Sequence, residues 1–448
     1  MDYIPNTDSD RDRMLSSIGM ASLKDLFADV PREALLSEAL PLPPPLSEPA
    51  LAAELKSLSE ENLALDHSLS FLGGGAYNHF IPAVVKHLIG RAEFYTSYTP
   101  YQAEISQGIL QAIYEYQTLI CDLTKMDVAN ASMYDGATAA AEAVSLACRY
   151  TKKKEVLLSQ ALHPGYRAVI RTYGNFAGWN IKEVPHSSSG TLDLDLAINS
   201  LSNETACFVL SQPNFFGCIE EGGAALAEAV HSKGGLFIVS IDPISLGLLT
   251  PPGEYGADIV TGEGSSMGNP PSFGGPGLGV FAAKAEYLRF MPGRLSGATV
   301  DAKGRRGFVL TLQTREQHIR RERATSNICT NEALNALAAT IYLAALGKQG
   351  LKRVAGLCIQ KANYAKAKIG KIPGFSPSFS APTFKEFVFS LPLPAEKINK
   401  YLLRKGIIGG LPLSRFYPEL KNHMLLCVTE LIRKKDIALL IQNLRGIK

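Results

Sequence analysis

Long apolar runs are absent from this sequence of 448 residues. The two clearest, 206–210 and 236–241, are far shorter than the ~20 residues of a membrane-spanning helix. They indicate buried strands, and we expect no membrane association. An excess of charge of one sign is also absent, because 45 Lys and Arg face 42 Asp and Glu. A nucleic-acid binder would need a concentrated basic face, and the one dense cationic run, 315–323, is too short to provide it.

Paired cysteine motifs are absent as well. The seven cysteines form no CxxC pair and no zinc-like grouping with histidine, so we expect free thiols and no metal site. Free thiols are typical of a reducing compartment. Residues 1–14 (MDYIPNTDSDRDRM) are acidic and polar, unlike a secretory signal. We therefore expect a cytoplasmic protein.

The chain is long enough to bury a large core and to divide into domains. Residues 1–70 contain short helical stretches around a proline-rich break at 40–46 (LPLPPPL). A segment of this kind cannot build its own core, so we expect an N-terminal helical arm. We expect residues 71–330 to form a large α/β domain with interface loops. Residues 331–448 should supply connecting helices and a small C-terminal α+β domain.

Helices and short apolar strands alternate through the large domain. A helix is expected at 137–150, after a longer one at about 104–125. Strands are expected at 155–158, 207–210, 236–241, 259–261 and 278–282. This alternation predicts a mostly parallel sheet with helices on both faces. With the arm and the small domain, it suits the aminotransferase-like, fold type I architecture of pyridoxal phosphate enzymes, although architecture alone does not establish chemistry.

Enzymes of that type need a phosphate cradle, a ring-stacking group, a carboxylate at the pyridine nitrogen and a lysine. Gly136 and Thr138 open an alanine-rich helix that could hold an anion, although a simple glycine turn would look the same. His163 follows a strand closely, as a ring-stacking histidine would. Asp242 ends the strand 236–241, where a carboxylate would meet the ring nitrogen. Each is individually also explained as a structural residue.

The lysine is missing from its expected place. It should lie some tens of residues after Asp242 and before a glycine-rich turn, and the matching segment is 264–277 (GSSMGNPPSFGGPG). No lysine stands between Lys233 and Lys284, and Lys284 lies beyond the following strand. A serine hydroxyl cannot condense with an aldehyde to give an aldimine. This chain is therefore not expected to hold its own internal aldimine.

Long segments of the chain resemble the P-protein of the glycine cleavage system, glycine decarboxylase, in its N-terminal half or α-subunit. The resemblance is carried by residues 71–82 (FLGGGAYNHFIP), 93–108 (EFYTSYTPYQAEISQG), 130–136 (NASMYDG) and 314–331 (TREQHIRRERATSNICTN), with 13–19 (RMLSSIG) near the start. In that family, one half or subunit carries the lysine-bound cofactor and the other is a copy that lost it. The resemblance implies that Ser265 stands at the lost lysine position. Pro271–Phe273 also departs from the lysine-bearing pattern.

The resemblance further implies that this copy lines the partner's active site. The tyrosine-rich loop, residues 95–102, would contribute Tyr95, Tyr98, Thr99, Tyr101 and Gln102, with Asn78 and His79 nearby. Its phenolic and amide groups suit a small anionic substrate and a lipoyl arm, although an aromatic packing cluster is the alternative. The hydroxyl-rich turn, residues 325–327, would reach the partner's cofactor phosphate through Thr325, Ser326 and Asn327. The adjacent arginines could equally form an interface salt-bridge strip.

The implied activity is that of glycine dehydrogenase (aminomethyl-transferring, decarboxylating), subunit 1. A lysine-bearing subunit 2 would hold pyridoxal phosphate covalently, in a heterodimer or a dimer of heterodimers. The complex would release CO2 from glycine and pass the aminomethyl group to lipoylated H-protein, alongside the T and L proteins. Two rivals remain open: a free-standing, non-catalytic pseudoenzyme that binds or scaffolds, and a complete enzyme of this fold such as a cysteine desulfurase. The missing lysine argues against the second rival.

Overall fold

The computed structural model describes residues 5–36, 38–95 and 99–447, the side chain of Tyr95 excepted. The chain forms two units, Met1–Leu63 and Ala64–Lys448. Unit 1 holds four helical elements: α1 (Asp8–Ser17), η1 (Leu23–Phe27), η2 (Arg32–Ala34) and α2 (Glu48–Glu60). Thr7 and Asp10 form a capping box that starts α1. The apolar side chains of α2, Leu51, Leu55 and Leu58, are 46%, 57% and 53% exposed, so this unit buries almost nothing by itself.

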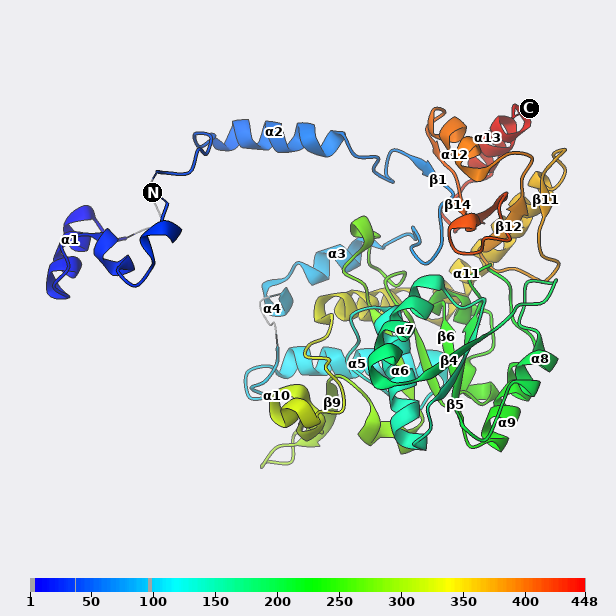
Figure 1. The fold of residues 1–448 in the computed structure, drawn as a ribbon, viewed down its shortest axis with the longest axis horizontal. Coiled ribbons are helices and arrows are strands. Elements are labelled where there is room, and N and C mark those ends of the chain that lie inside the picture. Colours follow the sequence, from blue (N-terminus) through cyan, green and yellow to red (C-terminus); the bar gives the residue numbers. More distant parts are fainter. Residues whose placement is uncertain (1–4, 37, 96–98, 448) are drawn as a thin grey trace. The chain divides into compact units, whose positions relative to one another are not determined.

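A seven-stranded sheet forms the centre of unit 2 (Figure 1). In spatial order its strands are β2 (Val128–Ala129), β8 (Gly279–Ala283), β7 (Ile259–Glu263), β6 (Leu236–Ile241), β5 (Thr205–Gln212), β3 (Glu155–Ser159) and β4 (Asn180–Val184). Strands β7, β6, β5, β3 and β4 pair in parallel, whereas β8 runs antiparallel to both of its neighbours. This confirms the expected mostly parallel sheet.

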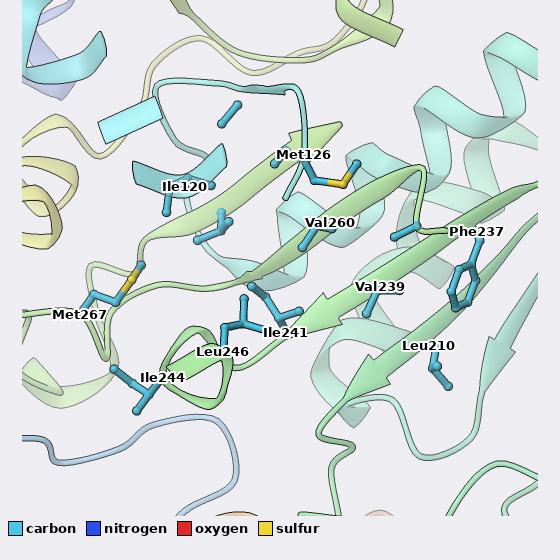
Figure 2. Close-up of a cluster of buried hydrophobic side chains, with 14 of the residues drawn as sticks. Ile120, Met126, Leu210, Phe237, Val239, Ile241, Ile244, Leu246, Val260 and Met267 are labelled. Atoms are coloured by element: carbon cyan, nitrogen blue, oxygen red, sulfur yellow. The ribbon is translucent and has the colours of Figure 1, made fainter. Parts of the chain in front are cut away.

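Apolar side chains leave both faces of this sheet, as a doubly covered parallel sheet requires. On one face, Leu210, Phe237 and Val260 pack with α5 (Gln107–Thr124), α8 (Leu194–Asn199), α9 (Gly223–Ser232) and the start of α11 (Ala333–Ile369). Figure 2 shows part of this cluster around the strand side chains. On the other face, Val209 and Ile238 pack against α6 (Gly136–Thr151) and α7 (Pro164–Ala177). Alternate strand residues therefore serve two separate cores.

Several elements surround the large sheet. They are α3 (Ala83–Ile89), α4 (Ala92–Tyr95), the antiparallel hairpin of β9 (Leu295–Val300) and β10 (Arg306–Thr311), and α10 (Gln317–Arg320), with short 3-10 turns η3 (Pro243–Gly247), η4 (Pro252–Tyr255), η5 (Ser272–Gly274), η6 (Ala285–Phe290), η7 (Gln313–Arg315) and η8 (Arg321–Arg323). The hairpin packs on α5. The amide of Gln107 donates to the carbonyl of Phe308 over 2.8 Å and holds the hairpin against the helix.

The long helix α11 leads from the large domain to the small one. It is interrupted at Gly347, whose φ of 59° and ψ of −177° are not helical. Beyond it, a four-stranded antiparallel sheet has the order β11 (Ser376–Pro377), β12 (Glu386–Ser390), β15 (His423–Cys427) and β14 (Leu411–Pro412). Helices α12 (Ala395–Leu403) and α13 (Lys434–Arg445) pack on it with the end of α11. A 3-10 turn η9 (Leu413–Arg415) and the parallel pair β1 (Leu69–Ser70) and β13 (Ile407–Ile408) complete the domain.

These elements match the expected class: a large α/β domain and a small α+β domain. Among the described residues, no helix is both long enough and apolar enough to cross a bilayer.

Candidate functional site

The parallel strands β5, β6 and β7 end at one edge of the sheet, where the helices α6 and α7 begin. His163 and Asp242, which the sequence predicts to belong to one pocket, both line a cavity at this edge. Its volume is only about 50 Å³, whereas pockets for cofactors and drug-sized ligands hold about 300–1,000 Å³. Three larger hollows, of about 740, 610 and 580 Å³, lie elsewhere on unit 2. The pocket at the strand ends is therefore nearly filled, and the chain's own side chains fill it.

Lys385 is the cation that pairs with the pocket residue Asp242. Its Nζ lies 2.7 Å from Oδ2 of Asp242, and its side chain is only 2% exposed. It also lies 3.5 Å from the centre of the Tyr77 ring, a close cation–π contact. Burial is the largest single effect and opposes the charge on Lys385, but attraction to Asp242, together with Cys427 and Cys358, outweighs it, so the pKa of this lysine lies above its ordinary value. Asp242 thus already has a cationic partner, supplied by the residue just before β12.

His79 and Glu430 extend this buried network. The Nε2 atom of His79 lies 3.0 Å from Lys385 Nζ, and its Nδ1 lies 2.7 Å from the Glu430 carboxylate. Burial, followed by the neighbouring ammonium of Lys385, lowers the pKa of His79. The neutral ring then accepts from the lysine and donates to Glu430. Cys358 lies 3.5 Å from the same carboxylate. This cluster has metal-ligand residue types, but the Lys385 ammonium beside it opposes a bound cation.

Glu386, which follows Lys385 in the chain, binds the glycine-rich segment 73–77. Its carboxylate accepts from the amide of Gly74 over 2.7 Å and from the hydroxyl of Tyr77 over 2.6 Å. Burial raises the pKa of Glu386 to about 7 although both groups donate to it. Gly73 lies so close to Glu386 that an added Cβ would sit 2.1 Å from its carboxylate oxygen. The small domain therefore holds the segment that carries Tyr77, Asn78 and His79.

The start of α6, the predicted anion cradle, is occupied by two carboxylates. Asp135 caps the helix by accepting from the amide of Thr138 over 2.8 Å, and the Thr138 hydroxyl donates back to the Asp135 carbonyl. Glu263, at the end of β7, accepts from the amide of Gly136 over 3.0 Å. It also accepts from the amides of Ser265 and Leu278 over 3.0 and 2.8 Å. The orphan donors at this helix end already face negative charge.

Ser265 lies where the sequence predicts, two residues beyond the end of β7. The loop that follows it carries Ser272 and Phe273 at φ of 41° and 57°, in the left-handed region. The Phe273 side chain is 97% exposed. Asn335 holds the end of this loop through its amide, which donates to the carbonyl of Gly277 over 2.9 Å. The residues Pro271–Phe273, which differ from the lysine-bearing pattern, therefore lie in a strained, exposed loop next to the start of α11.

His163 caps α7 at the mouth of the pocket. Its Nδ1 accepts from the amide of Gly165 over 3.0 Å, so the proton sits on Nε2, which lies 2.9 Å from the carbonyl of Gly74. The ring packs edge-on against Phe215. Burial lowers the pKa of His163. Both ring nitrogens of this histidine therefore already hydrogen-bond backbone groups, one of them in the glycine-rich segment.

The tyrosine-rich loop and the 329–331 segment meet at Arg294. The buried guanidinium donates to the Tyr101 hydroxyl over 3.3 Å and lies 5.5 Å above the Tyr101 ring. It also donates to the Cys329 carbonyl over 2.8 Å and to the Asn331 side chain over 3.1 Å. Tyr101 is 55% exposed, Gln102 is exposed and Thr99 is partly buried. Tyr98 and the side chain of Tyr95 lie outside the described residues.

The hydroxyl-rich turn lies a few residues before this junction. The Thr325 amide donates to the carbonyl of Arg315 over 3.1 Å, and Asn327 is exposed. The Ser326 hydroxyl accepts from the amide of Ile328 over 3.1 Å, and burial raises the pKa of Glu142 on α6. Cys329, the exposed member of the seven cysteines, follows directly. The structure thus joins Tyr101 to the segment after the turn, whereas His79 belongs to the Lys385 network and the Asn78 carbonyl accepts from the Thr429 hydroxyl over 2.8 Å.

Sequence reasoning missed three residues that organise these sites: Glu263, Arg294 and Lys385. A signal existed for Lys385 and Glu386, because a charged pair inside the apolar run 384–389 (FKEFVF) indicates buried, partnered charges. Glu263 follows a buried strand directly, where a carboxylate would face a helix start. Arg294 has no such signal.

Known proteins resemble the chain along its whole length. Residues 1–444 match the family described as glycine cleavage system P-protein. The chain belongs to this family. It is 53% identical over 442 residues to a probable glycine dehydrogenase (decarboxylating) subunit 1 from Geobacillus kaustophilus, covering 99% of this chain and 98% of that protein. The corresponding protein from Desulforamulus reducens is 51% identical over 449 residues, with both chains fully covered.

Solved structures agree with this membership. The crystal structure of a glycine decarboxylase (P-protein) of the glycine cleavage system, in inhibitor-bound form, has a TM-score of 0.92 and 46% identity, with both chains fully covered. A sphingosine-1-phosphate lyase from Burkholderia pseudomallei, at 16% identity and a TM-score of 0.64, covers 93% of this chain and 94% of its own, and shows the fold alone. The P-protein family depends on pyridoxal phosphate, and the fold is the fold type I class expected from the sequence.

The pocket of this chain does not fit that cofactor. Ser265 supplies no amine, the cavity holds about 50 Å³, and Asp242 is paired with Lys385. At the helix start, Glu263 and Asp135 already accept from the backbone amides that a phosphate would need. No step of a reaction is therefore assigned to this pocket.

Proposed function

We propose that this chain is subunit 1 of a two-subunit glycine decarboxylase and acts only with a lysine-bearing partner subunit. The partner would hold the pyridoxal phosphate that reacts with glycine. The complex would release CO2 from glycine and transfer the aminomethyl group to the lipoyl arm of H-protein. The relatives named glycine dehydrogenase subunit 1 support the partnership. The observation that carries the proposal is that the Asp242 carboxylate of this chain already forms an ion pair with Lys385.

This chain's own residues would act at the partner's site. Tyr101 and Gln102 present exposed phenol and amide groups, and Arg294 fixes the Tyr101 hydroxyl. Rigidly held donors lower a barrier more than mobile ones, because they need no reorganisation during the reaction. Thr325, Ser326 and Asn327 follow as candidates for contact with the partner's cofactor phosphate. Thr99, with Tyr95 and Tyr98, completes the proposed lining.

Reconstitution tests this function. The full chain is expressed alone, the lysine-bearing subunit alone, and both together, and glycine-dependent CO2 release is measured with lipoylated H-protein. We expect activity from the pair, and no activity from this chain by itself. A free-standing pseudoenzyme would neither co-purify with that subunit nor change its activity. Activity of this chain without the partner would contradict the proposal. We also propose a cytoplasmic location, in keeping with seven free thiols.

A further inference from the structure

Two charges of opposite sign serve the nearly filled pocket: Glu263 lines it, and Lys385 pairs with its lining residue Asp242. Lys385, from the small domain, lies 2.7 Å from the Asp242 carboxylate at the end of β6. Glu263 accepts from the amides of Gly136, Ser265 and Leu278 around the start of α6. Pyridoxal phosphate has the same two charged ends: a cationic ring nitrogen that pairs with a carboxylate, and an anionic phosphate that binds helix amides.

We propose that Glu263 and Lys385 are internal substitutes for the two charged ends of the cofactor, so that this chain fills its own pocket and binds no phosphorylated ligand there. The inference deepens the proposed function, which places the cofactor on the partner, but its test does not depend on that function. It also gives the two residues a positive role. A copy that had merely lost its lysine would leave Asp242 without a cation and the helix amides without an anion, and both losses are costly in a buried site.

The contacts around Lys385 favour this role over a Schiff-base role. The ammonium is engaged by Asp242, by His79 and by the Tyr77 ring at once. It is therefore fixed at the Asp242 carboxylate, the group that would otherwise pair with a cationic ring nitrogen. Lys385 also links the small domain to Asp242 of the large domain, and Glu386 links it to Gly74 and Tyr77.

The anion end is tested with inorganic phosphate. Melting temperatures of the full chain and of Glu263→Ala are measured with and without phosphate, then with pyridoxal phosphate. Glu254→Ala, which removes an exposed carboxylate, is the matched control. We expect phosphate to raise the melting temperature of Glu263→Ala by about 1–2 °C and to leave the wild type and the control unchanged. Equal stabilisation of the wild type, or a folded Glu263→Ala that gains nothing, would overturn the proposal.

The cation end is tested by a double-mutant cycle that stands even if Glu263→Ala does not fold. Urea midpoints are compared for wild type, Asp242→Asn, Lys385→Met and the double variant. Because Lys385→Met strands a buried carboxylate, removing that charge as well should restore about half or more of the lost midpoint. Strictly additive losses would refute the pairing. Borohydride reduction of the wild type with pyridoxal phosphate should label no lysine, and labelling of Lys385 would refute its assignment. Glycine decarboxylation by the wild-type complex is measured separately, so failure of the proposed function is distinguishable.

Discussion

At the scale of single residues, Arg294 connects the tyrosine-rich loop to the segment that follows the hydroxyl-rich turn. Its guanidinium contacts Tyr101 and the 329–331 segment together. Among the described residues its buried Nε has no hydrogen-bond partner, and its other two nitrogens donate to these two segments. A fixed arginine over an aromatic ring restricts the tyrosine, and that restriction is what a preorganised donor requires.

Tyr101→Phe separates the chemical role of the hydroxyl from packing. The ring and its contact with Arg294 remain, so the free energy of unfolding should fall by about 1 kcal/mol or less. In the reconstituted complex, the barrier for glycine decarboxylation should rise by about 2–4 kcal/mol, because a positioned donor is lost. Tyr114→Phe is the control, since Arg306 lies 6.0 Å above that ring but outside the loop. Unchanged turnover in Tyr101→Phe would show that the hydroxyl has only a packing role.

Glu220 predicts a pH dependence of stability. Burial raises its pKa to about 7, although Asn214 and the amide of Leu192 donate to it. A raised carboxyl pKa means that the folded state binds the proton more tightly than the unfolded state. The stability that this provides is complete below about pH 4.5 and is lost as pH rises through about 7. The loss is about 3 kcal/mol at most. In Glu220→Gln, unfolding free energies measured between pH 5 and 8 should fall less than in wild type, whereas exposed Glu221→Gln should behave as wild type does.

Ser265→Lys restores the missing amine but should not restore the enzyme. Glu263 still accepts from the helix amide and Lys385 still pairs with Asp242, and the volume of the pocket is about 50 Å³. We expect the variant with added pyridoxal phosphate to show no stable visible absorption after dialysis and no CO2 release from glycine. Stoichiometric borohydride trapping at the new lysine would show instead that the pocket admits the cofactor. The Ser265→Ala chain provides the baseline.

At the scale of elements, α2 is a helix without a core of its own. Leu51, Leu55 and Leu58 recur at helical spacing and are about half exposed. Such a stripe is typical of a helix that buries its apolar face against another surface. We therefore interpret the N-terminal unit as an arm for the partner subunit.

Leu55→Glu tests this interpretation. It should leave the urea midpoint of the chain unchanged, because the side chain is 57% exposed, but weaken co-purification with the lysine-bearing subunit. Ser57→Glu adds the same charge elsewhere on the helix, where the side chain is also exposed, and should assemble normally. If both variants assemble equally well, the leucine stripe does not contact the partner.

The elements also show what the sequence could reveal. Strand β6 was predicted with the bounds that it has, and β3, β5, β7 and β8 to within two residues, because buried parallel strands are continuous apolar runs. The β9–β10 hairpin and β4 were not predicted. The strand β4 lies at the sheet edge, and its residues alternate between exposed and partly buried until the buried Val184, so no apolar run marks it.

The residues of the site also fall into those that the sequence predicts and those that it does not. Asp242 and His163 follow strand ends as predicted, because the order of elements determines where the ends meet. Ser265 lies two residues beyond β7, and its assignment as the lost lysine position stays a prediction. Lys385 could not be placed, since 143 residues separate it from Asp242 along the chain (385 − 242). Only the packing of the small domain against the large one brings the two charges together.

At the scale of the whole molecule, we propose that the chain contributes to catalysis through its outer surface. Its own pocket is filled, whereas Tyr101, Gln102, Asn327 and Phe273 are exposed. An arrangement of this kind is useful only in an assembly, where a neighbour provides the reacting group. The free chain and the assembled chain should therefore differ at these surfaces rather than in the core.

Cys329 offers a way to watch that difference. It is the exposed cysteine of the seven, it lies shortly after the hydroxyl-rich turn, and its carbonyl accepts from Arg294. A maleimide dye should therefore attach at this one position, without any engineered cysteine. Its labelling rate should drop several-fold once the lysine-bearing subunit is added, and Cys329→Ser should abolish labelling. Labelling of Cys329 would then report binding of the partner at the surface formed by the tyrosine-rich loop and the hydroxyl-rich turn.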